Sequence, residues 1–211
     1  MRVRKKPWAE QEWLDNPYCI QDPGPYAKTM PSLFANSNPI HVELGCGKGR
    51  FITQTALRFP EINFIAVDRD PTIAATAARQ AREHALTNVR FLPMDAREFP
   101  AYFNAGEIGR LYLNFSDPWP KKAKRAKRRL THSDFLAIYE SLAIAEIHFK
   151  TDNRVLFEFS LNQFSERGWV MRNIALDLHR DADKMQENIM TEYEAKFSPF
   201  GPIYRLEAYK F

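Results

Sequence analysis

Residues 40–67 read Ile40-His-Val-Glu-Leu-Gly-Cys-Gly-Lys-Gly-Arg-Phe-Ile-Thr-Gln-Thr-Ala-Leu-Arg-Phe-Pro-Glu-Ile-Asn-Phe-Ile-Ala-Val67, and this stretch decides the fold. The apolar run over 40–44 predicts a strand, the glycines after it a turn, and the apolar spacing over 50–59 a helix. A second apolar run over 63–67 predicts a strand that ends at Asp68. Such a βαβ unit has parallel strands and, in nearly all proteins, a right-handed crossover.

The turn of this unit, residues 43–49, reads Glu-Leu-Gly-Cys-Gly-Lys-Gly. Glycines at a strand-to-helix turn let the backbone approach a ligand, and the helix N-terminus can face a polar group. A nicotinamide dinucleotide site requires GxGxxG, but Arg50 takes the place of the third glycine. A P-loop requires Gly-Lys-Ser/Thr, but Lys48 is followed by Gly49. A structural turn without a ligand is the remaining alternative.

The acids near this turn favour a ligand that carries positive charge and no pyrophosphate. Glu43 stands just before the glycines Gly45 and Gly47, and Asp68 is placed to bind a ribose diol. S-adenosylmethionine carries an ammonium and a sulfonium group and fits this description. We therefore predict S-adenosylmethionine as the cofactor.

Strands and helices alternate through the rest of the chain. Helices are predicted over 71–84, 133–141 and 154–167, and strands over 89–92, 110–115, 145–149, 169–178 and 204–210. This alternation predicts one α/β domain over residues 39–211. Residues 1–38 contain five prolines and no steady periodicity, which predicts an irregular arm rich in aromatic and basic residues. Its basic tip either reaches nucleic acid or is a frayed terminus.

Two further acids follow strands of the predicted sheet. Asp95 comes after the third strand, where it could accept a hydrogen bond from the exocyclic amine of an adenine. It could also cap a short helix running towards Phe103, and the two roles are compatible. Asp117 comes after the fourth strand, at the edge of the sheet where ligands gather in such folds.

A rigid, strongly basic segment follows Asp117. Pro118 and Pro120 fix their own φ and push the residues before them towards extended geometry. Seven of the nine residues from Lys121 to Arg129 are Lys or Arg. A carboxylate and an aromatic ring beside a positive patch suit a flat base attached to a phosphate backbone. A solvated charge run is the alternative.

Composition sets limits on the class of protein. A chain of 211 residues with a net charge of +4 is long enough for one domain and is not a polycation. Two cysteines and five scattered histidines provide neither a disulfide framework nor a metal-ligand pattern, so we expect no metal. No secretory signal and no apolar run long enough to cross a membrane is present, and we expect a cytoplasmic protein.

Several motifs together resemble the bacterial tRNA (guanine-N7-)-methyltransferase family. The resemblance runs from about Ile40 to the C-terminus. The motifs that carry it are Glu-Leu-Gly-Cys-Gly-Lys-Gly at 43–49, Leu-Asn-Phe-Ser-Asp-Pro-Trp-Pro-Lys-Lys at 113–122, Arg-Arg-Leu at 128–130, His-Phe-Lys-Thr-Asp-Asn at 148–153 and Thr-Glu-Tyr-Glu at 191–194.

The resemblance implies a Rossmann-like class I methyltransferase fold with a mostly parallel seven-stranded sheet and helices on both faces. It also implies methyl transfer from S-adenosylmethionine to N7 of a guanine in the tRNA variable loop. The implied cofactor site contains Glu43, Gly45, Gly47, Asp68, Asp95 and Asp117, and Asp117 is also the implied catalytic residue. The implied tRNA-binding residues are Lys121, Lys122, Lys124, Arg125, Lys127, Arg128, Asp152 or its neighbour Asn153, Thr191, Glu192, Tyr193 and Glu194.

One departure from the family is visible, because residues 141–146 lack the glycine that the family usually has before its fifth strand. Two other functions stay open at this point. The Asp-Pro-Trp loop partly resembles the loop of enzymes that methylate an exocyclic amine. A catalytically inactive RNA-binding module is the other alternative. The partner is expected to be tRNA, and the chain is expected to be a monomer or a homodimer.

Overall fold

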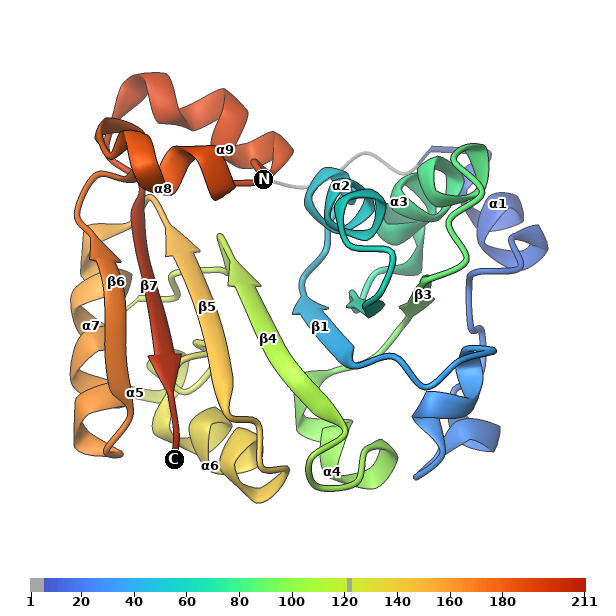
Figure 1. Ribbon diagram of the computed structural model, residues 1–211, viewed down its shortest axis with the longest axis horizontal. Helices are drawn as coiled ribbons and strands as arrows, with labels where there is room; N and C mark the ends of the chain where they lie inside the picture. The colour runs from blue at the N-terminus through green and yellow to red at the C-terminus, as the bar shows by residue number, and fades with distance from the viewer. Residues whose placement is uncertain (1–5, 121–122) are drawn as a thin grey trace.

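The computed structural model describes residues 6–120 and 123–211 (Figure 1). Within these residues, seven strands form one sheet in the order β3-β2-β1-β4-β5-β7-β6. The strands are β1 (Ile40–Leu44), β2 (Asn63–Val67), β3 (Val89–Leu92), β4 (Ile108–Asn114), β5 (Glu146–Thr151), β6 (Val170–Ala175) and β7 (Tyr204–Tyr209). Strands β1 to β5 pair in parallel, whereas β7 runs antiparallel to both β5 and β6. The predicted mostly parallel α/β fold is confirmed.

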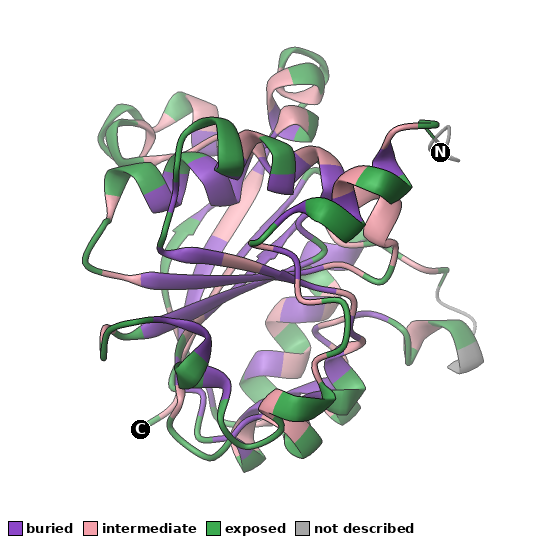
Figure 2. Cartoon of the chain, turned by 90° about the vertical axis from the view of Figure 1, so that its right-hand side faces the viewer, coloured by how far each residue is buried: buried purple, intermediate pink, exposed green. Residues whose placement is uncertain are grey.

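Helices cover the two faces of the sheet. One face carries α1 (Ala9–Asp15), α2 (Arg50–Arg58) and α3 (Pro71–Glu83), and the other carries α4 (Phe99–Tyr102), α6 (Ser133–Ser141) and α7 (Arg154–Glu166). Three short helices lie outside these layers: α5 (Ala123–Ala126), α8 (Ala182–Glu187) and α9 (Glu192–Phe197). In Figure 2 the buried strands form a central layer between the helices.

Strand alternation divides the core in two. In β2, Phe64 and Ala66 face the cluster under α1, α2 and α3, while Ile65 and Val67 face the cluster under α6 and α7. All five residues of β2 are buried, as expected for a central strand covered on both faces.

The N-terminal region is more ordered than its sequence indicated. Helix α1 packs against α3, and its Trp13 is buried in the α3-side cluster. Met30 and Leu33 enter the cluster on the opposite face. The prediction of an irregular arm is therefore wrong for Ala9–Asp15, because seven residues are too few to show a helical period. The boundary between residues 38 and 39 stays a prediction.

Among the described residues, no helix has both the length and the apolar character needed to cross a membrane.

The turn that lacks the family's glycine adopts the conformation that favours one. Helix α6 ends at Ser141 with Leu142 as its C-cap, and Ala143 has a φ of 52°. The Ala143 N–H donates to Glu140 O and the Ile144 N–H donates to Tyr139 O, each at 3.0 Å. This is a Schellman ending, in which glycine is preferred because a Cβ is strained in the left-handed region.

We expect Ala143→Gly to raise the free energy of unfolding by about 0.5–1 kcal/mol, because it relieves this strain. The matched control is Ala137→Gly, in the middle of the same helix at an exposed position, which should lower it by about 1 kcal/mol. Urea unfolding of both variants measures the difference. A loss of stability in Ala143→Gly would contradict the assignment.

Candidate cofactor and substrate site

A cavity of about 770 Å³ opens at the edge of the sheet where β1, β2 and β4 end. Parallel strands bring their carboxyl ends to this edge, which is the usual ligand site of doubly wound folds. Its lining residues are Leu44, Gly45, Val67, Asp68, Arg69, Ile73, Met94, Asp95, Ala96, Arg97, Asn114, Phe115, Ser116, Asp117, Trp119, Arg128, Leu130 and Phe135. The structure thus brings Asp68, Asp95 and Asp117 into one cavity.

The glycine turn beside the cavity uses the conformational freedom of its glycines. Gly45, Gly47 and Gly49 have φ values of 78°, 55° and 85°. A Cβ on Gly45 or Gly47 would meet no atom within 4 Å, so open space lies beside the backbone there. A Cβ on Gly49 would lie 2.0 Å from Cβ of Ala77, so this glycine is required for α2 to pack against α3.

Asp68 fixes the shape of this turn. Its Oδ2 accepts a hydrogen bond from the Gly47 N–H at 3.1 Å, and its Oδ1 accepts one from the Asp70 N–H at 3.0 Å. Burial raises the pKa of the Asp68 carboxyl, and the two backbone hydrogen bonds oppose the shift. The carboxylate therefore links the end of β2 to the glycine turn that follows β1.

Asp95 has the capping role that the sequence allowed. Its side chain accepts a hydrogen bond from the Arg97 N–H at 2.9 Å, and Glu98 accepts one from the Asp95 N–H, so the two form a capping box. The guanidinium groups of Arg69 and Arg97 lie 3.6 and 3.3 Å from Asp95 Oδ2. Because Asp95 also lines the cavity, capping and ligand binding remain compatible.

Glu43 occupies a different position from the three aspartates. It is 1% exposed and is not among the residues that line the cavity. Its Oε1 accepts a hydrogen bond from Nδ2 of Asn114, which does line the cavity, at 2.9 Å. Its Oε2 has no hydrogen-bond partner within the described part of the chain. Burial raises the pKa of the Glu43 carboxyl to about 8, and the Asn114 hydrogen bond and the nearby Lys150 charge oppose the shift.

The loop after β4 presents Asp117 to solvent. Phe115 has a φ of 51°, and its N–H donates to Lys150 O at 2.8 Å, so the strand turns sharply at its end. Left-handed conformations of bulky residues carry strain and cluster at functional sites. The exposed Asp117 therefore stands on a turn that the sheet itself holds in place.

Arg129 differs from the basic residues before it. It is 2% exposed and, among the described residues, belongs to the largest fully buried side chains. Its Nε donates to the carbonyl oxygens of Pro118 and Trp119, both at 2.9 Å. The expectation that the whole cluster to Arg129 contacts phosphate is wrong for Arg129, because its guanidinium is used to hold the Pro-Trp-Pro loop.

The rest of the basic cluster is accessible where it can be described. Arg125, Lys127 and Arg128 are exposed, and the Arg128 guanidinium lies 4.9 Å from the centre of the Trp119 ring. Lys121 and Lys122 lie outside the described residues, as does the side chain of Lys124. The exposed cations form a ledge next to the cavity, because Arg128 and Trp119 also line it.

Residues 152 and 153 have separate tasks. Asn153 caps α7, because its Oδ1 accepts a hydrogen bond from the Leu156 N–H at 2.8 Å. Asp152 is exposed, and its Oδ2 accepts a hydrogen bond from the Tyr193 hydroxyl at 3.0 Å. The Tyr193 ring lies 5.1 Å from that of Phe115 and 4.3 Å from that of Phe197. An aromatic surface with a carboxylate at its edge thus stands beside the loop of Asp117.

The segment 191–194 divides into exposed and buried side chains. Glu192 accepts a hydrogen bond from the Arg50 N–H at 3.2 Å, so it touches the start of α2. Thr191 caps α9 by accepting a hydrogen bond from the Glu194 N–H at 2.9 Å. Glu194 is fully buried.

No individual role was predicted from the sequence for Phe115, Lys150 or Arg129, since nothing in their spacing distinguished them from core or surface residues.

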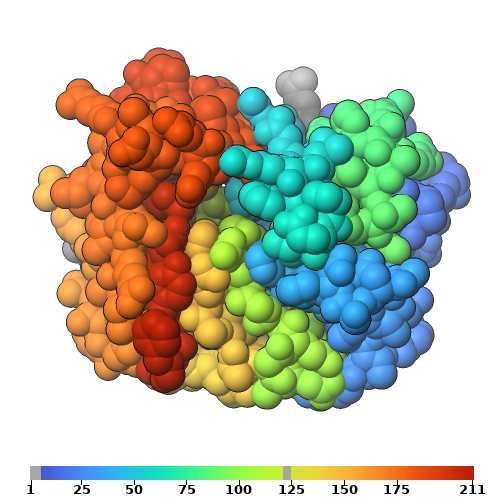
Figure 3. All heavy atoms as spheres, viewed as in Figure 1, coloured from blue at the N-terminus to red at the C-terminus, as the bar shows by residue number. Residues whose placement is uncertain are grey.

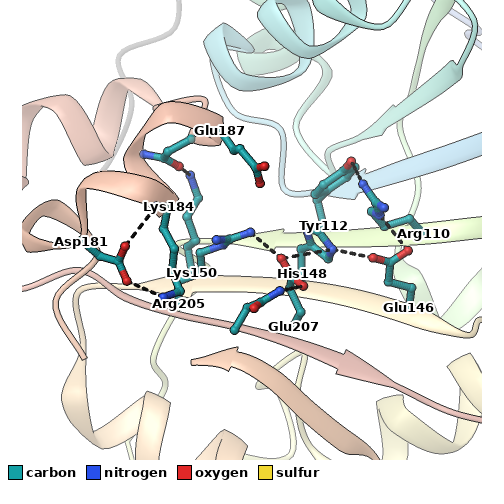
Figure 4. Close-up of polar contacts among 12 residues, drawn as sticks. Arg110, Tyr112, Glu146, His148, Lys150, Asp181, Lys184, Glu187, Arg205 and Glu207 are labelled. Atoms are coloured by element: carbon teal, nitrogen blue, oxygen red, sulfur yellow. Dashed lines mark hydrogen bonds and ion pairs between the residues drawn. The ribbon is translucent and has the colours of Figure 1, made fainter. Parts of the chain in front are cut away.

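A second cavity, of about 460 Å³, lies on the α2 face of β4, β5 and β7. Figure 3 shows parts of these strands at the surface between α2 and the orange segment of β6 and α8. The polar groups there pair with one another (Figure 4): Arg110 lies 2.9 Å from Glu146, whose other oxygen lies 2.7 Å from His148 Nε2. These mutual pairs make the second cavity a weaker candidate for a ligand than the first.

We expect Glu43→Gln to change the pH dependence of stability in the ligand-free protein. Because the pKa of Glu43 is raised in the folded state, only the unfolded chain loses this proton as the pH rises from about 5 to 8. The free energy of unfolding of the wild type therefore falls over this range. The stability of Glu43→Gln relative to wild type should therefore increase, by up to about 1.4 kcal/mol per pH unit over that range. Chemical unfolding of both proteins at a series of pH values measures it, and a constant difference would contradict the expectation.

Solved structures with low sequence identity share the fold. The 16S rRNA methyltransferase KamB matches with a TM-score of 0.63 and 15% identity, covering 86% of this chain and 92% of that one. A 16S rRNA (adenine(1408)-N(1))-methyltransferase variant from Catenulisporales acidiphilia matches with a TM-score of 0.60 and 17% identity, covering 90% and 94%. These similarities establish a Rossmann-like class I methyltransferase fold.

Sequence relatives are much closer. The family model described as "Putative methyltransferase" matches residues 37–205. The tRNA (guanine-N(7)-)-methyltransferases of Staphylococcus haemolyticus and Bacillus subtilis are 48% and 46% identical to this chain. The first alignment covers 99% of this chain and 97% of the relative, and the second covers 98% of each. With a family model over most of its length and such relatives over nearly all of it, the chain belongs to the bacterial tRNA (guanine-N7-)-methyltransferase family.

Proposed function

We propose that this chain transfers the methyl group of S-adenosylmethionine to N7 of a guanine in the variable loop of tRNA. The observation that carries the proposal is the single cavity lined by Asp68, Asp95 and Asp117, with an exposed basic ledge at its side. The names of the relatives, at 46–48% identity, support the same reaction and substrate.

The residues at the cavity fit a cationic, nucleoside-containing cofactor. Open space beside Gly45 and Gly47 leaves room for a ligand to approach the backbone. Asp68 is placed to accept hydrogen bonds from a ribose, and Asp95 to accept one from an adenine amine. When bound, S-adenosylmethionine supplies an electrophilic methyl group on a positively charged sulfur.

The protein's task in this reaction is alignment. Guanine N7 has a lone pair in the neutral base, so no proton has to leave before it attacks and a general base is not obligatory. Correct orientation of two reactants can lower a barrier by roughly 7–11 kcal/mol. The Asp117 carboxylate, on its strained turn, stabilises positive charge near the reacting atoms and so favours the cationic 7-methylguanine product.

Asp152 and Tyr193 are suited to hold the guanine. Tyr193 is 43% exposed and its ring lies beside those of Phe115 and Phe197, so it offers a face on which a base can stack. The Tyr193 hydroxyl orients Asp152, whose carboxylate retains capacity to accept the N1–H and N2–H of a guanine. We assign the substrate contact to Asp152 because the Asn153 side chain is used in capping α7.

Incubation with labelled S-adenosylmethionine and tRNA lacking 7-methylguanosine, followed by nucleoside analysis, tests the function. We expect label in 7-methylguanosine with wild type, and a loss of about 100-fold or more in Asp117→Ala with unchanged thermal stability, because Asp117 is exposed. The matched control is Asp15→Asn, an exposed acid on α1 that should retain full activity.

Other outcomes of the same experiment separate the alternatives. Label on an exocyclic amine would establish the second class of methyltransferase instead. tRNA binding without methyl transfer would identify an inactive RNA-binding module. Near-normal activity in Asp117→Ala would remove Asp117 from the mechanism.

The basic ledge should make tRNA binding strongly dependent on salt. We expect replacement of Arg125, Lys127 and Arg128 by Ala to weaken tRNA binding and to reduce the slope of log K against log salt by roughly 0.7–0.9 for each phosphate that the variant no longer neutralises. Arg172→Ala, on the edge strand β6, is the control and should leave the slope unchanged. Filter binding between about 50 and 200 mM salt measures the slopes. A wild-type tRNA affinity that does not change with salt concentration would refute the phosphate-binding role.

A further inference from the structure

Lys150 connects β5 to the segment that contains α8 and α9. Its ammonium group is almost fully buried and donates to Glu194 Oε2 at 2.7 Å, Ile189 O at 2.9 Å and Asn188 Oδ1 at 3.0 Å. All three acceptors belong to residues 188–194, and Figure 4 shows Lys150 on the side of the sheet nearest α8. One side chain of the sheet therefore uses its three donors on a single segment.

Glu194 has no oxygen left for an external ligand in this arrangement. Its Oε2 accepts from Lys150, and its Oε1 accepts from Asn188 Nδ2 at 2.6 Å and lies 3.1 Å from His179 Nε2. The residue is 0% exposed. Lys150 lowers the pKa of the Glu194 carboxyl against the effect of burial, so the buried carboxylate is held in its charged form. A direct contact of Glu194 with tRNA would require this cluster to open.

The segment held by Lys150 carries residues that contact both the start of α2, after the glycine turn, and the loop that follows β4. Glu192 accepts from the N–H of Arg50, directly after the glycine turn. The Tyr193 ring lies against that of Phe115, and its hydroxyl donates a hydrogen bond to Asp152. The main chain of Lys150 takes part as well, because its carbonyl oxygen accepts the Phe115 N–H at 2.8 Å.

We propose that the buried ion pair of Lys150 and Glu194 is the positioning device that fixes α9 against the sheet, and that Glu194 acts through Lys150 instead of contacting the RNA. The pair sets the distance of Tyr193 from Phe115 and Asp152, and that of Glu192 from the glycine turn. This inference rests on the proposed function, because its consequence is expressed in guanine binding and methyl transfer.

The chemistry of buried ion pairs separates this role from a substrate contact. Removing one partner leaves an uncompensated buried charge, whereas replacing both by apolar side chains of similar size is often tolerated. The Phe51 ring, 5.4 Å from Lys150 Nζ, already provides an apolar neighbour. If the pair only positions α9, replacing both residues should therefore restore activity. If the Glu194 carboxylate binds tRNA, replacing both residues should not restore it.

Steady-state kinetics of Lys150→Met, Glu194→Met and the double variant test the proposal. We expect each single variant to lose about 100-fold or more in kcat/KM for tRNA, with a raised KM, and the double variant to recover to within about 10-fold of wild type. A double variant as weak as Glu194→Met would overturn the proposal, because the carboxylate itself would then be needed by the substrate.

Glu140→Gln is the matched control for a general loss of stability. Glu140 also forms an ion pair, with Arg167, and accepts a hydrogen bond from the Trp169 indole at 2.9 Å, on the face of the sheet away from α9. This variant should lower the melting temperature but leave the KM for tRNA unchanged. An equal rise of KM in Glu140→Gln and Glu194→Met would show that KM follows stability alone, which would also overturn the proposal.

Should Glu194→Met fail to fold, Glu194→Gln in wild-type and Lys150→Met backgrounds provides the same comparison. The effect of Glu194→Gln on KM should disappear when Lys150 is Met, and its persistence would contradict the proposal. Different outcomes would refute the proposed function and the positioning role. Absence of methyl transfer by wild type would refute the proposed function, whereas an active wild type with no recovery in the double variant would refute the positioning role alone.

Discussion

Parallel backbone pairing is the constraint on which the site depends. Pairing of β1 with β2 and β4, and of β2 with β3, places the last residues of these strands at one edge of the sheet. Asp68, Asp95 and Asp117 come from segments separated by more than twenty residues each, yet they line one cavity because each follows such a strand. Antiparallel pairing would distribute these acids over two opposite edges.

The sequence predicted the parts of this arrangement that local pattern governs. The apolar runs before Asp68 and Asp117 are visible as strands, and the glycines after β1 indicate the turn that lies beside the cavity. All of β2 and the last four residues of β4 are buried, so their apolar composition alone is a strong signal. The capping role of Asp95 also followed from its local sequence.

Long-range partners could not be read from the sequence in the same way. Lys150 and Glu194 are 44 residues apart, and no periodicity links a lysine in a strand to an acid in a short helix. Glu43 belongs to the predicted cofactor set, but strand alternation turns its side chain behind the cavity, where it meets Asn114. The burial of Arg129 was missed for a related reason. The residues of a basic run look alike in sequence, and only the folded loop before the run shows which of them its carbonyl groups bind.

The burial of Arg129 has a consequence for how this part of the chain tolerates change. Its bonds to the Pro118 and Trp119 carbonyl groups close a loop whose ends are ten residues apart, so the segment between them is bounded at both ends. A substitution between these anchors leaves the spacing of Arg129 from the loop unchanged. Inserting or deleting a residue there is different, because it would move another side chain into the buried slot. The number of residues between Trp119 and Arg129 therefore places the Arg129 guanidinium against the loop carbonyl groups.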